Sequence, residues 1–354
     1  MAGKTACIIL AAGLGKRMRS ETVKVLHPVC GEALVDYPVG LALKRGYDPI
    51  VVVVGRQARA VENHLRERFG DALHFAVQDP PQGTGHAVLQ TKKALAGHRG
   101  QVAILCGDVP LLGSKELSRL EQAGKKAPVA FLTCRLDNPS GYGRVLRDGA
   151  GRVEAIVEHR DADVSQRRID EINTGIYLVK AKVLFSALGR VGRGNAQGEF
   201  YLTDVVELAR SQGHGVAGVQ VDPENLQGVN DRIDLARVAK IVNRRLAEKL
   251  MKQGVSILDP DRVCLEASVR VGMDSILWPG CVLQGDVRVG KGCVIGPGAI
   301  LKDCRVGDGS QILAYSLVES SQVGRDCSVG PFARLRPGTR LANRVRVGNF
   351  VETK

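Results

Sequence analysis

The loop that follows the first apolar stretch carries residue types suited to binding phosphate. Gly13 and Gly15 lie within residues 10–18, and Arg17 and Lys24 follow them. Glycines let backbone amides approach a phosphate closely, and two cations can offset a triphosphate charge that shifts during group transfer. A lone G-x-G is weak evidence, and the spacing and Lys-Ser/Thr ending of a P-loop are absent. The loop therefore predicts a phosphate site of another kind.

A second group follows a later apolar stretch, where Cys106 and Gly107 precede Asp108. A carboxylate at a strand end would face a ligand crevice and could hold a metal ion, although Gly-Asp is often only a turn. Cys106 is expected to be a buried strand end. His86 could suggest acid–base catalysis, but we expect it to begin a helix and pack there. In addition, no Ser or Cys stands beside a His as an activated nucleophile would.

The elements that must position these residues alternate between apolar strands and helical stretches. Strands are predicted at ACIILAA, PIVVVVG, LHFAV and QVAILCG, and the segment RQARAVENHLRERFG has helical spacing of its apolar residues. Strands so continuously apolar belong inside a parallel sheet covered on both faces. The fold class is therefore α/β, with an open Rossmann-like sheet whose ligands lie beyond the carboxyl ends of the strands.

Residues 231–254 form a charged segment with periodic apolar residues, which predicts a linker helix. The pattern of residues changes after this segment. Beyond it, Val-Gly or Ile-Gly recurs at 271, 289, 295, 306, 323, 329 and 347, with several gaps of six or eighteen residues. Such a repeat predicts a left-handed parallel β-helix of hexapeptides, three to a coil. The alternative, a β-sandwich with accidental Val-Gly pairs, does not produce multiples of six.

Composition limits the class of protein. A length of 354 residues predicts two domains, and no apolar run approaches the roughly 20 residues of a membrane span. No signal peptide is evident, so we expect a cytoplasmic protein whose nine cysteines are reduced structural thiols. The net charge of +13 is spread along the chain and accompanied by only 4% aromatics, which disfavours nucleic acid and suits polyanionic small substrates.

Read together, the motifs resemble one branch of the sugar-nucleotide pyrophosphorylases. The first loop matches L-x-x-G-x-G-x-R-M followed by a lysine, and the later motifs occur in the family's order: QDPPQGTGHA from 78, GDVP from 107, GYGR from 141, VEH from 157, EINTG from 171, NAQGE from 195 and GVN from 228. The branch is the bifunctional bacterial N-acetylglucosamine-1-phosphate uridyltransferase and glucosamine-1-phosphate acetyltransferase. The resemblance covers essentially the whole chain.

The resemblance implies a nucleotidyltransferase domain over residues 1–230, the linker helix over 231–254 and a β-helix, an incomplete acetyltransferase domain, over 255–354. It also assigns roles to individual positions. Catalysis falls to Arg17 and Lys24, and magnesium to Asp108 and Asn230. The implied nucleotide- and sugar-binding positions are Leu10, Ala11, Ala12, Gly13, Lys24, Gln78, Gly83, Thr84, Cys106, Gly107, Asp108, Gly143, Glu158, Asn173 and Asn230. Among these, Gln78, Gly83 and Thr84 are expected at the uracil, and Gly143, Glu158 and Asn173 at the acetylated sugar.

The implied reaction converts UTP and N-acetylglucosamine 1-phosphate into UDP-N-acetylglucosamine and pyrophosphate for cell-envelope precursors. We expect direct in-line attack on the α-phosphorus, helped by Mg²⁺, positioning and cationic stabilisation. One carboxylate and one amide oxygen suffice for Mg²⁺, which keeps waters and substrate phosphates as its other ligands.

The family's β-helix carries a second activity, acetyl transfer to glucosamine 1-phosphate, at a site shared within a trimer. Arg336 and Lys354 match two of its sugar-phosphate positions, but the coils with its catalytic histidine and coenzyme A surface are missing before the end at Lys354. We therefore expect a shortened chain without acetyl transfer. A homotrimer through the β-helix is the expected assembly, although the missing coils could supply much of its interface.

Three alternatives stay open. A related enzyme could use glucose 1-phosphate with UTP or dTTP, although the GYGR, VE and EINTG segments disfavour it. A non-catalytic scaffold would need broken phosphate or metal positions, and Arg17, Lys24, Asp108 and Asn230 are all intact. A stand-alone hexapeptide acyltransferase is disfavoured by the missing coils.

Overall fold

The computed structural model describes residues 4–13, 15–56 and 58–354 and divides into two compact units. The first comprises Met1–His27 and Ala33–Asp234, and the second comprises Pro28–Glu32 and Leu235–Lys354. Leu14 of the glycine-bearing loop and Gln57 of the predicted helical stretch lie outside the described residues, as do residues 1–3.

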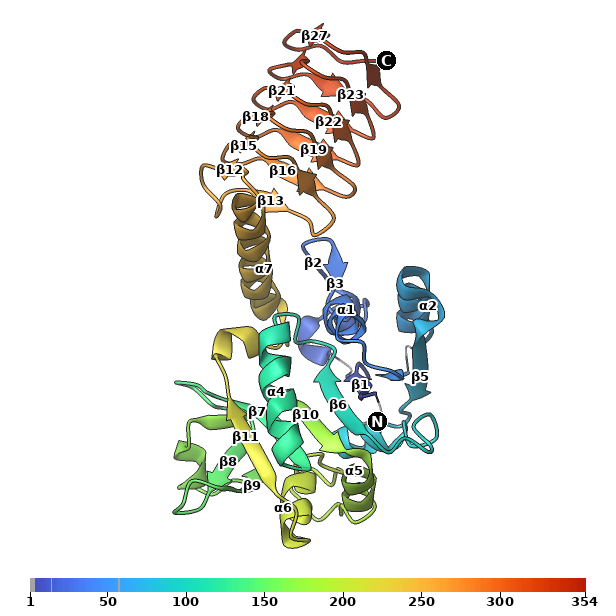
Figure 1. Cartoon of the computed structure of the whole chain (residues 1–354), viewed down its shortest axis with the longest axis vertical. Coiled ribbons are helices and arrows are strands. Elements are labelled where there is room, and N and C mark those ends of the chain that lie inside the picture. The colour runs from blue at the N-terminus through green and yellow to red at the C-terminus, as the bar shows by residue number, and fades with distance from the viewer. Residues whose placement is uncertain (1–3, 14, 57) are drawn as a thin grey trace. The chain divides into compact units, whose positions relative to one another are not determined.

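The first unit is built on a nine-stranded mixed sheet among the described residues (Figure 1), in the order β11-β7-β10-β6-β1-β4-β5, with β8 and β9 joined at β10. Strands β1, β4, β5 and β6 are parallel neighbours, whereas β10 runs antiparallel to β6 and β7. The strands are β1 Ala6–Leu10, β4 Ile50–Val54, β5 Leu73–Val77, β6 Gln101–Cys106, β7 Val129–Arg135, β8 Arg144–Arg147, β9 Val153–Val157, β10 Glu171–Lys180 and β11 Val216–Gln220.

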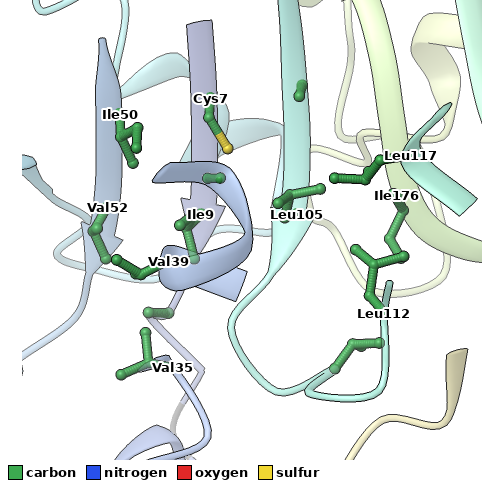
Figure 2. Packing of buried hydrophobic residues seen from close by; sticks show 14 of the residues in the cluster. Cys7, Ile9, Val35, Val39, Ile50, Val52, Leu105, Leu112, Leu117 and Ile176 are labelled. Atoms are coloured by element: carbon green, nitrogen blue, oxygen red, sulfur yellow. The ribbon is translucent and has the colours of Figure 1, made fainter. Parts of the chain in front are cut away.

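The continuous apolar strands are explained by burial on both faces of this sheet. Along β1, Cys7 and Ile9 point into one hydrophobic cluster and Ala6 and Ile8 into another, and all four are fully buried. Figure 2 shows the first cluster, where Val39 of a covering helix packs near Ile9 of β1. Full burial of an aliphatic side chain contributes about 1.5–3 kcal/mol.

Helices cover both faces of the sheet. Residues of α1, α2 and α4 belong to the first cluster, and residues of α3, α5 and α6 belong to the second. The helices are α1 Asp36–Lys44, α2 Ala58–Phe69, α3 Thr84–Leu89, α4 Ser114–Lys126, α5 Ala181–Leu188, α6 Asp204–Ser211 and α7 Arg232–Lys252. None of them, within the described ranges, is long and apolar enough to cross a membrane.

The second unit is a parallel β-helix whose stacked coils form three parallel sheets. One sheet contains β12 Ser256–Ile257, β15 Ile276–Leu277, β18 Val294–Ile295, β21 Gln311–Ile312, β24 Ser328–Val329 and β27 Arg346–Val347. The second contains β13 Cys264–Leu265, β16 Val282–Gln284, β19 Ile300–Lys302, β22 Leu317–Glu319 and β25 Arg334–Leu335. The third contains β14 Arg270–Val271, β17 Arg288–Val289, β20 Arg305–Val306, β23 Gln322–Val323 and β26 Arg340–Leu341. The predicted fold class, an α/β sheet followed by a left-handed parallel β-helix of hexapeptide repeats, is confirmed.

The coils of the β-helix differ in length. After the first pairing, in which Ile257 and Leu277 are 20 residues apart, partners in adjacent coils are 18 residues apart towards the two ends, as with Val271 and Val289. In the middle they are 17 apart, as with Val289 and Val306. From β13 to β27, consecutive inward residues are six positions apart except at two places, where five separate Leu301 from Val306 and Val318 from Val323. Both shortened stretches lie at the corner between the second and third sheets, so the stacking is preserved. The Val-Gly pairs at 306 and 323 depart from the six-residue spacing for this reason.

Helix α7 is more than a connection, because most of it belongs to the second unit. Its Ala247 and Leu250 are buried in the same cluster as the inward residues of the coils. A short hairpin of β2 Pro28–Val29 and β3 Glu32–Ala33, which sequence reasoning missed, also joins this unit. The Ala267 amide donates to the Cys30 carbonyl at 2.9 Å.

Candidate functional site

A cavity of about 570 Å³ opens beyond the carboxyl ends of the parallel strands. Leu10 ends β1, Cys106 ends β6 and Gln78 directly follows β5, so three strands of one sheet edge deliver its lining. The described lining residues are Leu10, Ala12, Gly13, Gly15, Lys16, Arg17, Lys24, Val25, Gln78, Pro81, Gly83, Thr84, Ala87, Cys106, Asp108, Glu199 and Asn230. The cavity lies where an open α/β sheet places its ligands.

The glycine-bearing loop determines the path of Lys24. Gly15 has φ 57°, in the left-handed region, and caps the 3-10 helix η1 Lys16–Met18. A Cβ added to Gly15 would lie 2.5 Å from Cβ of Lys24, and one added to Gly13 would lie 4.0 Å from its Cε. The lysine stem therefore passes over Gly15 because no side chain stands there.

Lys24 ends on Asp108, with its Nζ donating to Oδ2 of the carboxylate. The two side chains are 12% and 24% exposed, so the pair is largely withdrawn from water. Gly107 sets the approach: its amide donates to the Leu10 carbonyl at 2.9 Å, and a Cβ there would lie 2.9 Å from the same oxygen. Position 107 thus needs glycine for the close crossing of β1 and β6 chain ends.

Arg17 and Asn230 meet at the same cavity. A guanidinium nitrogen of Arg17 donates to Oδ1 of Asn230 at 2.8 Å, and the Asn230 amide donates to Asp234 at 3.1 Å. The amide of the preceding residue, Val229, donates to the Asp108 carbonyl at 2.9 Å. The structure thus brings all four residues predicted for phosphate and metal to one place.

The predicted uracil residues form a second edge of the cavity. Gln78 is 4% exposed, and its Nε2 donates to the Gly83 carbonyl at 2.9 Å. Gly83 has φ 103°, and a Cβ there would lie 2.5 Å from the Phe200 carbonyl oxygen. Thr84 Oγ1 accepts from the Leu202 amide at 3.1 Å. The segment around Phe200 thus supports this loop and brings Glu199, for which sequence reasoning gave no role, to the cavity.

His86 lies in the first turn of α3, as expected. Its ring lies 6.1 Å from that of Phe200, and its two nitrogens face Gln78 at 3.2 Å and Gln90 at 3.0 Å. These amide contacts hold the ring as part of the support for Gln78. Nothing in this geometry gives the imidazole a reacting atom.

The predicted sugar residues form a separate cluster outside the lining of the cavity. The Asn173 amide donates to the Gly143 carbonyl at 2.9 Å, and a Cβ on Gly143 would lie 3.5 Å from the Glu158 carboxylate. Thr203 Oγ1 donates to Glu158 at 3.1 Å, and burial raises the pKa of Glu158.

The sugar cluster is linked to the cavity through one short path. The Gly175 amide donates to Asn173 Oδ1 at 3.2 Å, and the Cys106 thiol contacts the Gly175 carbonyl at 3.5 Å. Burial raises the pKa of Cys106 to about 12, so the thiol stays protonated at neutral pH. All nine cysteines are described and free of disulfides, as the expectation of reduced thiols requires.

Two more of the predicted binding residues, Ala11 and Gly107, do not line this cavity. Ala11 is 3% exposed and points into the core with Ile9, because side chains alternate along the strand direction. Gly107 acts through its backbone and does not line the cavity. Arg336 and Lys354, assigned by the resemblance to the β-helix, lie in the second unit, where Arg336 Nε donates to Glu352 at 2.8 Å.

The donor chemistry at Asp108 and Asn230 fits a hard divalent cation. They offer a carboxylate and an amide oxygen, and each oxygen already holds a cationic group. No cluster of three or more His, Cys, Asp or Glu side chains suited to a metal occurs among the described residues. A metal here would therefore need ligands from substrate phosphates and water.

Comparisons with known protein families identify the class of enzyme to which the first unit belongs. Residues 6–222 match the nucleotidyl transferase family, and residues 263–353 match the GMPPB C-terminal domain. With the glycine-bearing loop and the cavity at the sheet edge, this makes the first unit a nucleotidyltransferase.

Proteins similar over the whole chain identify the family within this class of enzyme. The chain is 46% identical over 355 residues to the bifunctional protein GlmU of Trichlorobacter lovleyi, and the match covers 99% of this chain and 76% of that one. It is 47% identical to GlmU of Pelobacter propionicus, with 99% and 76% covered, and to GlmU of Anaeromyxobacter dehalogenans, with 99% and 72% covered. The chain belongs to the bifunctional GlmU family, and it spans about three quarters of these relatives' length.

Proposed function

We propose that the enzyme transfers the uridylyl group of UTP to N-acetylglucosamine 1-phosphate, giving UDP-N-acetylglucosamine and pyrophosphate. The observation that carries the proposal is the convergence of Arg17, Lys24, Asp108 and Asn230 at one cavity, although they are up to 213 residues apart in sequence. Two cations with a carboxylate and an amide oxygen suit a metal-bound triphosphate. The family membership and the resemblance of the motifs supply the base and sugar.

The uridylyl transfer is a single displacement in this proposal. An oxygen of the sugar phosphate forms a bond to the α-phosphorus of UTP, and the bond from that phosphorus to the bridging oxygen breaks. Pyrophosphate leaves with the electron pair. Arg17 and Lys24 hold the phosphates in line and offset the charge on the transferring group, an effect worth about 10²–10³ in rate for one such group.

Mg²⁺ is the proposed divalent metal, with Asp108 and Asn230 as its protein ligands. When bound, it neutralises phosphate charge and orients the triphosphate. Gln78, with Gly83 and Thr84, is proposed at the uracil. Its amide is held by the Gly83 carbonyl, so one orientation is available to read a base edge.

Gly143, Glu158 and Asn173 are proposed to hold the acetylated sugar. Glu158 can accept a hydrogen bond from a sugar hydroxyl while Thr203 fixes one of its carboxylate oxygens. The side-chain amide of Asn173 can donate to the acetamido group. Glycine at 143 keeps the space beside Glu158 open. This cluster is also where glucose 1-phosphate would be distinguished from the acetylated sugar.

The domain assignment follows the same proposal. Residues 1–230 are the proposed uridylyltransferase, 231–254 the linker helix and 255–354 the β-helix, which we propose to mediate a homotrimer. UTP supply places the proposed activity in the cytoplasm. Arg336 and Lys354 are proposed to belong to an acetyl-transfer site, and release of free thiol from acetyl-CoA by the purified chain would test that activity.

The deciding measurement is pyrophosphate release with Mg²⁺, UTP and N-acetylglucosamine 1-phosphate. We expect release that requires all three and falls by about 10² or more in Asp108→Asn, because the metal loses its carboxylate. Asp286→Asn, an exposed carboxylate of the β-helix, is the matched control and should keep full activity. Faster release with glucose 1-phosphate, or with dTTP in place of UTP, would favour the related enzyme; no release with any pair would favour a scaffold.

A further inference from the structure

Each proposed metal ligand is paired in the structure with one of the proposed phosphate-binding cations. Lys24 Nζ contacts Asp108 Oδ2, and Arg17 contacts Asn230 Oδ1 at 2.8 Å. The cations and the oxygens, which are proposed to serve different partners in the reaction, therefore satisfy one another.

The lysine contact is built into the fold. Its stem passes over Gly15, where a Cβ would lie 2.5 Å from the lysine Cβ, and only 12% of the side chain is exposed. Asp108 is held at the end of β6 by the tight crossing at Gly107. Because both partners are positioned by backbone features, the ammonium group stays on the carboxylate unless another anion competes for it.

The charges at this contact oppose the binding of either ligand alone. A divalent cation approaching Asp108 meets an ammonium group already on the carboxylate, and the two cations repel each other at short range. A triphosphate that attracts Lys24 away leaves the Asp108 carboxylate facing phosphate oxygens, which is also unfavourable. When metal and triphosphate arrive together, the metal takes the carboxylate and the lysine takes a phosphate, so every charge keeps an opposite partner.

We propose that Lys24 competes with the divalent cation for Asp108 and thereby makes the binding of that cation conditional on the nucleotide. This inference rests on the proposed function for the identity of the ligands. Arg17 plays the same part at Asn230 more weakly, because an amide oxygen attracts a cation less than a carboxylate does. Such coupling between two ligands typically corresponds to a factor of about 5–150 in affinity.

The test measures metal binding in the absence of nucleotide and sugar phosphate. Mn²⁺ alone is titrated into the full chain, and the free ion is followed by its electron paramagnetic resonance signal. We expect weak binding to the wild-type protein and at least about tenfold tighter binding to Lys24→Met, within the range typical of coupled ligands. Lys24→Gln should behave alike, which guards against a defect peculiar to one variant, and thermal melting verifies that both fold.

Two further variants separate the specific contact from general charge. Lys16→Met removes the same charge from the same cavity lining and should leave Mn²⁺ affinity within about twofold of wild type, because loss of a more distant, exposed charge is screened. Adding Asp108→Asn to Lys24→Met should return binding to the weak level. Unchanged affinity in both Lys24 variants, or equal tightening in Lys16→Met, would overturn the inference.

The result is independent of the uridylyl-transfer assay. Tighter Mn²⁺ binding by Lys24→Met in a protein that releases no pyrophosphate would uphold the metal-excluding lysine and reject the proposed reaction. Pyrophosphate release by the wild-type enzyme with unchanged Mn²⁺ affinity in the variants would do the reverse.

Discussion

The two units differ in how far apart in sequence their contacting residues are. In the sheet unit, Lys24 meets Asp108 across 84 residues and Arg17 meets Asn230 across 213. In the β-helix, strands from β13 onward pair with the strand 17 or 18 residues away, as Ile295 does with Ile312. The first unit concentrates its charged groups at one point, whereas the second repeats one local solution. We therefore expect substitutions at the sheet edge to affect activity and substitutions within the coils to affect stability.

Removing a cation from the cavity should give the largest effect and sharpen this contrast. Arg17→Met is expected to lower kcat for pyrophosphate release by about 10²–10³, because the charge on the α-phosphate of the transferring uridylyl group loses a partner. The free energy of unfolding should change by less than about 0.5 kcal/mol, since Arg17 is exposed. Steady-state kinetics and urea denaturation measure the two quantities, and an unfolding change of several kcal/mol would break the comparison.

The reverse pattern is expected from the core of the coils. Ile295 is fully buried, and Ile295→Ala should destabilise the β-helix by about 2–5 kcal/mol through lost burial and a cavity. The kcat for pyrophosphate release at 25 °C should stay within about twofold of wild type. Val294→Ala, the outward neighbour on the same strand, is the control and should cost much less. Calorimetry that resolves the two units checks this prediction.

Substitution of a glycine at the cavity should lower both stability and kcat, each by an intermediate amount. Gly15→Ala adds a Cβ 2.5 Å from the Lys24 stem at a φ of 57°. We expect a loss of about 1 kcal/mol in stability from the left-handed conformation and a fall in kcat of about tenfold or more from displacement of the lysine. Gly46→Ala, also at positive φ but with open space around its Cβ, should reproduce the stability cost alone.

A smaller effect concerns pH. Burial, with the neighbouring Glu207 and Asp161, raises the pKa of Asp204 from 3.8 to about 6. A raised carboxyl pKa gives stability that is complete below pH 3.8 and is lost as pH rises through about 6. Asp204→Asn should therefore gain up to about 1 kcal/mol relative to wild type at pH 8 and little at pH 4, since the start of α6 partly favours the negative charge. Urea denaturation at the two pH values measures this gain; an equal gain at both would exclude titration of Asp204 as its cause.

Local pattern predicted the repeated parts of the fold well. The strand at Leu73–Val77 has the predicted limits, and β1 ends at Leu10, two residues before the predicted Ala12. The missed features depend on distant neighbours. The hairpin at Pro28–Ala33 is explained by its contact with Ala267, and the 17-residue coils arise at one corner that no single hexapeptide reveals.

The candidate site could be assembled from motifs but not from spacing. Nothing in the sequence around Arg17 indicates that it lies 2.8 Å from Asn230, so the role of Asn230 came only from the family resemblance. Glu199 reaches the cavity because the Phe200 carbonyl approaches Gly83, a close contact that becomes visible only in three dimensions. The lysine on Asp108 was also beyond prediction, since both residues were expected to face ligands.

The two five-residue stretches shorten the coils of the β-helix without changing which later residues face inward. Each removes one residue at a corner, and the inward and outward positions after it return to the same phase. An insertion of one residue between Leu301 and Val306 would restore a six-residue turn already present at that corner in neighbouring coils, whereas the same insertion within a strand would turn every later inward side chain outward. The corner is therefore where the length of this solenoid can drift during evolution without loss of its frame.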